Sequence, residues 1–231
     1  MFLSRRSTQA EYFDVERPVE ELQAFYRALG KVNSLFLVAE PFQRYIPRLL
    51  GHENVRRLNL LDLGAGDGSL GKRLTSWAGR QGWSWRVVNL DMNAKALSLN
   101  QDESNVAGSA LALPFKDSSF DVVIASQMTH HLDDEQVVRH LTEAWRVARR
   151  AVVISDLHRN LALYFGLRAL FLFSRFPRAF RTDGLLSVER AWRVGELASL
   201  ARKAGMNDPK VSLYFGARVL LQAWKAEHET I

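Results

Sequence analysis

"LLDLGAGDGSLG", residues 60–71, joins the end of an apolar run to the start of a helical pattern. The run "LNLLDLG" has the length and composition of a buried strand, whereas "SLGKRLTSWAGRQ" repeats its apolar residues at helical spacing. Gly64, Gly66 and Gly68 fall between the two elements, where the lack of a side chain lets the backbone approach a ligand closely. The stretch therefore predicts a nucleotide-sized binding turn between a strand and a helix.

Strand and helix patterns keep alternating on the C-terminal side of this turn. The expected strands cover residues 58–64, 85–91, 104–110, 120–127, 151–157, 210–216 and 218–226. The expected helices cover residues 69–81, 93–102, 134–150 and 189–205. Such alternation with continuous apolar strands predicts a parallel sheet covered by helices on both faces, and the short link between the last two strands predicts an antiparallel hairpin. The fold class is thus α/β: a Rossmann-like, doubly wound, mostly parallel seven-stranded sheet with an antiparallel C-terminal edge hairpin.

Two further segments are expected to form a cap on this sheet within a single domain, residues 1–231. Residues 1–50 show helical spacing with breaks at Pro18, Pro41 and Pro47 and form the N-terminal cap. Residues 157–187 form an apolar, arginine-studded insertion that we expect to be a helical lid lining an apolar pocket. Two alternatives for the insertion stay open, namely an ordinary core helix and a peripheral contact with an anionic membrane.

Composition limits the protein to a few broad classes. The chain has 231 residues and 47% hydrophobic content, which suits one domain with one core. The absence of cysteine excludes disulfides and thiolate metal sites. No apolar run is long enough for a signal peptide or a membrane span, so a cytoplasmic protein is expected. A net charge of +6 admits nucleic acid as a partner, although the arginines are scattered along the chain.

Two acidic residues at strand ends limit the chemical class of the ligand. A dinucleotide fingerprint needs glycine where this sequence has Ser69, which argues against a nicotinamide cofactor. Asp91 ends the next strand, where a carboxylate accepts hydrogen bonds from both ribose hydroxyls. Asp62 leads into the glycine turn, where a cation or a donor group would pass. A cationic ligand without phosphate suits such a turn better than a pyrophosphate does.

Four stretches, in this order and spacing, carry a resemblance: "LLDLGAGDGSLG", "VVNLDMNAKAL", "SNVAGSALALPFKDSSFDVVIASQMTHHL" and "EAWRVARRAVVISDLH". Over residues 55–225 the chain resembles class I S-adenosylmethionine-dependent methyltransferases. The resemblance implies S-adenosylmethionine as cofactor and S-adenosylhomocysteine as product. It implies these cofactor-binding residues: Asp62, Gly64, Ala65, Gly66, Asp91, Met92, Ser109, Ala110, Leu111 and Gln127. The family commonly has an acid where Ser109 stands, and serine can still accept the adenine amino group.

Three histidines are candidates for a general base, because an oxygen or carbon acceptor must lose a proton as it is methylated. His130 and His131 follow the fourth strand in "SQMTHHLDDEQ", which is similar to the His-Asp-Trp-x-Asp-Glu stretch of plant-type phenolic O-methyltransferases; the general base of that family falls on His130. His158 follows the fifth strand in "SDLHRN" beside Asp156 and Arg159. The alternative is that these histidines only pack or cap a helix. No histidine pair has metal-binding spacing with an acid, so no metal is predicted.

The acceptor is expected to be an apolar small molecule. "EYFDVERPVEELQAFYRALGKVNSLF" and "DGLLSVERAWRVGEL" resemble a bacterial subgroup that modifies polyketide-derived or quinone-like molecules in secondary metabolism. This likeness makes Tyr12, Phe13 and Asn33 candidate lid residues and favours methylation of an oxygen, or less readily a carbon. The alternatives are an RNA methyltransferase, although "SQMT" lacks the Asn/Asp-Pro-Pro-Tyr/Phe motif, and a non-catalytic cofactor-binding protein. The oligomeric state stays open.

Overall fold

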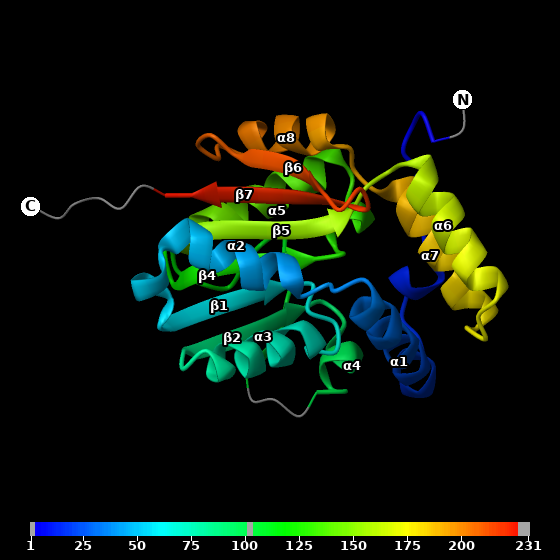
Figure 1. Ribbon diagram of the computed structural model, residues 1–231, viewed down its shortest axis with the longest axis horizontal. Helices are drawn as coiled ribbons and strands as arrows, with labels where there is room; N and C mark the ends of the chain where they lie inside the picture. Colours follow the sequence, from blue (N-terminus) through cyan, green and yellow to red (C-terminus); the bar gives the residue numbers. More distant parts are fainter. Residues whose placement is uncertain (1–2, 101–103, 226–231) are drawn as a thin grey trace, which may run out of the picture.

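A computed structural model describes residues 3–100 and 104–225 (Figure 1). Its centre is a seven-stranded sheet with the order β3-β2-β1-β4-β5-β7-β6. The strands are β1 (Arg57–Leu63), β2 (Ser84–Asp91), β3 (Asn105–Ala107), β4 (Phe120–Ser126), β5 (Ala148–Leu157), β6 (Lys210–Tyr214) and β7 (Arg218–Trp224). The first five run parallel, and β7 lies antiparallel between β5 and β6. The predicted Rossmann-like sheet with an antiparallel edge hairpin is confirmed.

Helices cover both faces of the sheet. They are α1 (Val19–Leu35), α2 (Glu40–Leu50), α3 (Ser69–Arg80), α4 (Ala94–Leu97), α5 (Asp134–Val147), α6 (Leu161–Leu172), α7 (Arg178–Arg190) and α8 (Val194–Lys203), with short 3-10 turns η1 (Tyr12–Asp14), η2 (His52–Val55) and η3 (Thr129–His131). Alternate residues of β4 point to opposite faces. Val122 and Ile124 pack in one core cluster with α2 and α3, whereas Val123 and Ala125 pack in the other with α5 and α8. The continuous apolar strands are therefore buried on both faces.

The N-terminal segment is less helical than its sequence spacing predicts. Pro18 caps α1 as expected, but residues 3–17 form a helix only in the short turn η1. The helices break between Leu35 and Glu40, close to the break predicted at Pro41, whereas Pro47 lies inside α2 and the break predicted there is wrong. Pro41 sits in the first turn, where a backbone N–H has no acceptor within the helix. Pro47 is buried, and tertiary packing outweighs the helical hydrogen bond that it lacks.

Three predicted helices have other boundaries. The helix expected over 134–150 ends at Val147, after which the chain enters β5 directly. The helix expected over 189–205 is interrupted between α7 and α8, because Trp192 pairs its backbone with His158 and its indole N–H donates to the Thr129 carbonyl at 3.0 Å. α4 is much shorter than the helix expected over 93–102, whose last residues lie outside the described part of the chain.

The cap lies beyond the carboxyl ends of the parallel strands, which point toward α1, α6 and α7 (Figure 1). A separate apolar cluster joins the inner face of α6 to α1 and α7, and the rings of Phe25 and Phe180 lie 5.5 Å apart within it. Residues 3–17 run across the same end, where the backbone amides of Tyr12 and Phe13 donate to Asp183 of α7. None of the described helices is long and apolar enough to cross a membrane.

Candidate functional site

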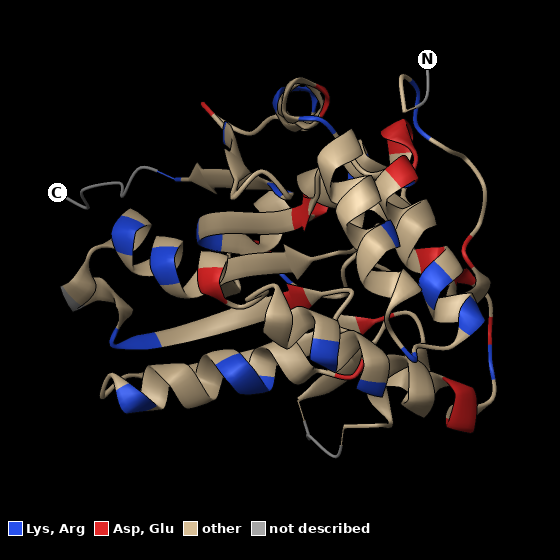
Figure 2. Ribbon diagram, turned by 45° about the vertical axis from the view of Figure 1, so that its right-hand side comes forward, with Lys and Arg blue, Asp and Glu red and all other residues tan. Residues whose placement is uncertain are grey.

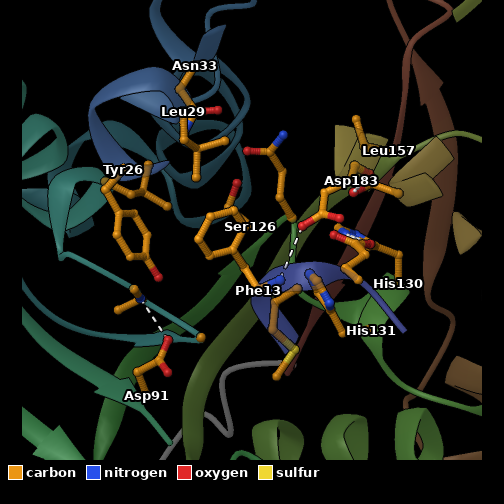
Figure 3. Close-up of a pocket in the computed structure, with 18 of the residues that line it drawn as sticks. Phe13, Tyr26, Leu29, Asn33, Asp91, Ser126, His130, His131, Leu157 and Asp183 are labelled. Atoms are coloured by element: carbon orange, nitrogen blue, oxygen red, sulfur yellow. Dashed lines mark hydrogen bonds and ion pairs between the residues drawn. The ribbon is translucent and has the colours of Figure 1, made fainter. Parts of the chain in front are cut away.

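A cavity of about 570 Å³ lies between the strand ends and the cap. Every residue predicted to bind the cofactor lines it, as do His130 and His131. Figure 3 shows Asp91 and Tyr26 on one side of the cavity and the two histidines on the other. The cavity therefore brings together the strand-end residues that follow β1, β2 and β4.

The glycine turn has a shape that only glycine allows. Gly64 and Gly66 have φ of 70° and 57°, in the left-handed region. A side chain at position 64 would collide with Met128, and one at position 66 with the ring of Tyr26. The amides of Gly64 and Ala65 donate to the carbonyl of Leu90 at 2.8 and 3.1 Å, which fixes the turn against the end of β2. The predicted close-approach turn is thus present and rigidly held.

Asp91 is held firmly where a ribose would need it. Its Oδ2 accepts from the amide of Gly66 and its Oδ1 from the amide of Asn93, both at 2.8 Å. Burial raises the pKa of this carboxyl, and the two backbone hydrogen bonds oppose that rise. Met92, 82% exposed, lines the cavity beside Asp91. Ser109 lines it as well, with its Oγ accepting from the amide of Leu111 at 3.2 Å.

Asp62 is a buried carboxyl without a full set of partners. It is 1% exposed, and within the described residues its Oδ2 has no hydrogen bond. Burial, with the nearby charges of Asp91 and Asp67, raises its pKa to about 8. A buried carboxyl at a cavity wall is stabilised by a cationic donor. The turn and its two acids therefore fit the expected cofactor, which carries a ribose and a positively charged amino group.

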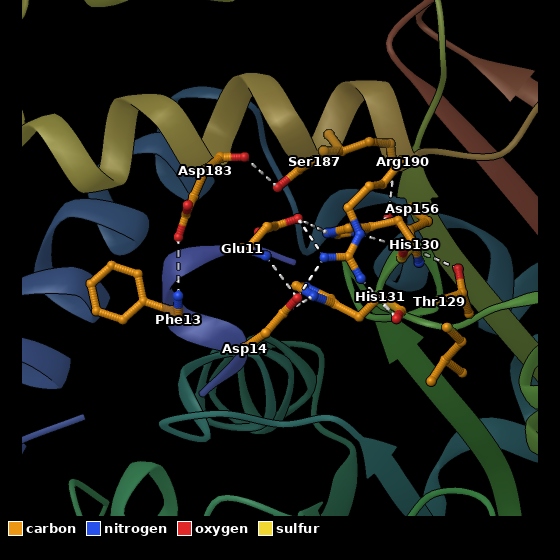
Figure 4. A network of polar contacts seen from close by, with 12 residues as sticks. Glu11, Phe13, Asp14, Thr129, His130, His131, Asp156, Asp183, Ser187 and Arg190 are labelled. Carbon is orange, nitrogen blue, oxygen red and sulfur yellow. Dashed lines mark hydrogen bonds and ion pairs between the residues drawn. The ribbon is translucent and has the colours of Figure 1, made fainter. Parts of the chain in front are cut away.

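His130 forms a buried pair with Asp156 (Figure 4). Its Nδ1 lies 2.6 Å from Oδ1 of Asp156, whose Oδ2 accepts from the His130 amide at 2.9 Å and from the Thr129 hydroxyl. Burial acts to raise the pKa of Asp156, but the His130 ring and these hydrogen bonds outweigh it and hold that pKa below the ordinary value. An ionised Asp156 makes Nδ1 the protonated nitrogen, which leaves the lone pair on Nε2.

The free nitrogen of His130 faces a second carboxyl. Oε1 of Glu11, on the N-terminal segment, lies 3.7 Å from Nε2 of His130 and 3.8 Å from Nη1 of Arg190. Within the described residues Oε1 has no hydrogen bond, and burial is the main cause that raises the pKa of Glu11 to about 7. Arg190 donates to the carbonyls of His130 and His131 and to Oδ2 of Asp14. The N-terminal segment is thus fastened to the histidine turn.

His131 belongs to the same network but has a different partner. Its Nδ1 lies 2.6 Å from Oδ1 of Asp14, and its side chain is about one third exposed. Glu11, His130 and His131 place their donor atoms within 4.8 Å of one another, a geometry that could hold a metal ion. The guanidinium of Arg190 already supplies a positive charge beside Glu11. The absence of a metal therefore stays a prediction.

Some predicted residues do not reach the cavity, and some residues that do were not predicted. His158 lies outside it, with its Nδ1 accepting from the side-chain Nδ2 of Asn160 at 2.9 Å. Tyr12 also lies outside and donates its hydroxyl to Glu21, whereas Phe13 and Asn33 line the cavity. Among the polar lining residues that sequence reasoning missed are Glu11, Asp14, Tyr26, Asp183 and Ser187. In the sequence these residues stand out only by lying in or near the segments predicted to form the lid. The packing of the cap is what brings their side chains to the cavity.

Comparisons with known proteins agree with this geometry. The family model described as "Methyltransferase domain" matches residues 61–154. Norajmaline N-methyltransferase from Rauvolfia serpentina is 30% identical over 113 residues, which cover 45% of this chain and 38% of that protein. A SAM-dependent methyltransferase structure from Aquifex aeolicus has a TM-score of 0.59 at 14% identity, over 91% of this chain and 100% of that one. Phosphoethanolamine N-methyltransferase 2 from Haemonchus contortus, in complex with S-adenosyl-L-methionine, has a TM-score of 0.55 at 12% identity, over 79% of this chain and 51% of that one.

The match of residues 61–154 to a methyltransferase domain agrees with the predicted resemblance to class I S-adenosylmethionine-dependent methyltransferases, and the chain shares the fold of solved methyltransferases. The cofactor of this class is S-adenosylmethionine, and the glycine turn, Asp62 and Asp91 are the residues here that fit it. The matched segment spans well under half of the curated relative, at 38%, so the acceptor of that relative is not carried over to this chain.

The raised pKa of Asp62 predicts that cofactor binding depends on pH. With a pKa of about 8, Asp62 is mostly protonated at pH 6, and a cationic ligand favours the ionised form. Binding therefore releases a proton below pH 8, and affinity rises by up to about tenfold per pH unit before it levels off. Titration calorimetry in buffers of different ionisation enthalpy measures the proton directly. In Asp62→Asn the proton release should vanish; an unchanged release would contradict this role of Asp62.

Proposed function

We propose that this protein transfers a methyl group from S-adenosylmethionine to an oxygen, or less readily a carbon, of an apolar aromatic or polyketide-like small molecule. The observation that carries the proposal is the His130–Asp156 pair, which presents Nε2 to a cavity that also contains the cofactor motif. Much of the remaining lining is apolar, and a group of these residues comes from the cap. These lining residues are Leu29, Val32, Leu163, Leu167, Phe171 and Phe180.

The proposed step needs a base and a dry, positioned acceptor. When bound, S-adenosylmethionine would supply a methyl group on its sulfonium sulfur, and the leaving group of an in-line displacement would be the neutral thioether S-adenosylhomocysteine. Nε2 of His130 accepts the proton of the acceptor hydroxyl as the new oxygen–carbon bond forms, and ionised Asp156 stabilises the resulting imidazolium. The apolar residues of the cap exclude water and hold the acceptor oxygen against the methyl group.

A nitrogen acceptor is a second candidate. It is favoured by Glu11, a lining residue whose buried Oε1 has no hydrogen bond within the described residues and suits the N–H of an amine, and by the N-methyltransferase relative. RNA is less well supported, because the cavity wall is largely apolar and Lys and Arg are spread over many elements (Figure 2).

The experiment that tests the proposed function is incubation of the protein and S-adenosylmethionine with matched panels of phenols and amines, followed by mass spectrometry. Methylated phenols support the oxygen reaction, methylated amines alone would replace it, and no product from either panel would count against both.

The carboxyl of Glu11 predicts a pH-dependent contribution to catalysis. An ionised Glu11 lies 3.7 Å from the nitrogen that becomes positively charged, so its charge favours proton transfer to His130. With a pKa of about 7, Glu11 ionises as pH rises through neutrality, and kcat/KM should rise with it. Glu11→Gln should lower kcat/KM by about tenfold above pH 7 and remove this part of the profile. A variant with an unchanged profile would show that Glu11 only fastens the N-terminal segment.

A further inference from the structure

Apart from Arg168, helix α6 carries only uncharged and mostly apolar residues, yet only one side of it is covered. Its inner face is buried in the cap cluster through Leu163, Tyr164, Leu167 and Phe171. Its other side carries Leu161, Phe165 and Leu172, which are 45%, 55% and 73% exposed, and Phe173 directly after the helix is 88% exposed. We call these four residues the outer α6 face. Apolar side chains this large are normally buried, so the outer α6 face lacks an apolar partner within the described chain.

The surroundings of the outer α6 face extend its apolar character. The turn between β6 and β7 lies beside the start of α6 (Figure 1), where the side-chain Nδ2 of Asn160 donates to the carbonyl of Gly216 at 3.0 Å. Phe215 in this turn is 78% exposed and Leu213 just before it is 50% exposed. Large apolar side chains thus stand in solvent on two neighbouring elements. Scattered single residues are ordinary on a surface, whereas a group of this kind marks a contact surface.

The charge of the chain around α6 distinguishes between two possible partners of this surface, a second copy of the chain and a membrane. From residue 160 to residue 182 the chain contains Arg168, Arg175, Arg178 and Arg181 but no aspartate or glutamate. A symmetric contact with a second copy would bring these like charges together. An anionic bilayer instead supplies phosphates for the arginines and hydrocarbon for the aromatic and aliphatic side chains. α6 is too short to span a membrane, so it would lie in the plane of the interface.

We infer that the outer α6 face docks on the surface of an anionic membrane. This inference depends only on the exposed side of α6 and its arginines, and it is independent of the chemistry in the cavity. The benefit of membrane docking for catalysis does rest on the proposed function. The inner face of the same helix lines the cavity through Leu163, Leu167 and Phe171, so docking brings the wall of the acceptor pocket next to a reservoir of lipophilic molecules.

The test is co-sedimentation of the full chain with vesicles of phosphatidylcholine alone or mixed with phosphatidylglycerol. We expect binding to the mixed vesicles that weakens as salt is added, since exposed charges are screened. The double variant Phe165→Ser/Phe173→Ser should bind the mixed vesicles at least about tenfold more weakly, because two large apolar side chains no longer enter the bilayer. Leu35→Ser/Leu37→Ser is the matched control, with two exposed apolar residues at the end of α1, and should bind like the unaltered protein.

Calorimetric binding of S-adenosylhomocysteine checks that each variant is folded and separates this test from that of the proposed function. Equal binding of both double variants would overturn the role of α6, and salt-insensitive binding to neutral vesicles would overturn the role of the arginines. Failure to bind any vesicle, together with a concentration-dependent dimer that Phe165→Ser/Phe173→Ser abolishes, would assign the face to a second copy of this chain instead.

Discussion

Replacement of His130 by alanine is expected to lower kcat/KM for a hydroxyl acceptor by about 10²- to 10⁴-fold, the range that a positioned general base contributes. The cause is the loss of the only nitrogen among the described histidines that both faces the cavity and is oriented by a fully buried carboxylate. Cofactor affinity should hardly change, because the cofactor motif lies on the other side of the cavity (Figure 3). Initial rates at several acceptor concentrations, with calorimetry for the cofactor, measure both quantities.

Asp156→Asn provides a second and more specific form of this test. An asparagine amide can donate to Nδ1 and so move the ring proton to Nε2, the nitrogen that has to accept the acceptor's proton. A large loss of kcat is therefore expected, and the double variant with His130→Ala should be no worse than His130→Ala alone, because the two residues act as one unit. His158→Gln is the matched control, since this histidine lies outside the cavity. A loss in His158→Gln equal to that in His130→Ala would contradict the assignment of the base.

The cofactor half of the site could be predicted from sequence because its parts are local. The glycine turn and Asp91 directly follow two strands, and parallel strands end at the same edge of a sheet. When the spacing of apolar residues identifies a strand, it therefore also predicts that the residue at the end of that strand lies at this edge of the sheet. Met92 and Ser109 were predicted from the family resemblance instead, and both line the cavity.

The acceptor half could not be predicted in the same way. His130 and His158 both follow strand ends, and only the backbone beyond those ends decides which ring points inward: the turn η3 aims His130 at Asp156, whereas pairing with Trp192 and Asn160 turns His158 away. Glu11 reaches the site from a segment with little regular structure, which α7 fastens across the cavity through Asp183 and Arg190. Such contacts depend on tertiary packing, which the spacing of apolar residues does not encode.

Asp91→Ala is expected to weaken the binding of both S-adenosylmethionine and S-adenosylhomocysteine by at least about 10²-fold. A hydrogen bond to a charged group contributes about 1.5–3 kcal/mol, and a carboxylate that accepts from two ribose hydroxyls makes two of them. The carboxylate also fastens the glycine turn, because it accepts from the amides of Gly66 and Asn93. Its loss therefore loosens the other half of the cofactor site as well.

Asp91→Asn separates these two contributions. The amide side chain keeps one oxygen that can accept from the Gly66 amide, so the turn should survive and thermal stability should change little. The charge-assisted bonds to the ribose are lost, because the side-chain amide nitrogen only donates. We expect affinities in the order unaltered protein, Asp91→Asn, Asp91→Ala, measured by calorimetry with the product S-adenosylhomocysteine, which needs no turnover. If Asp91→Ala bound the product as tightly as the unaltered protein, the cofactor would have to lie elsewhere, and the geometry of the His130 pair would lose its connection to methyl transfer.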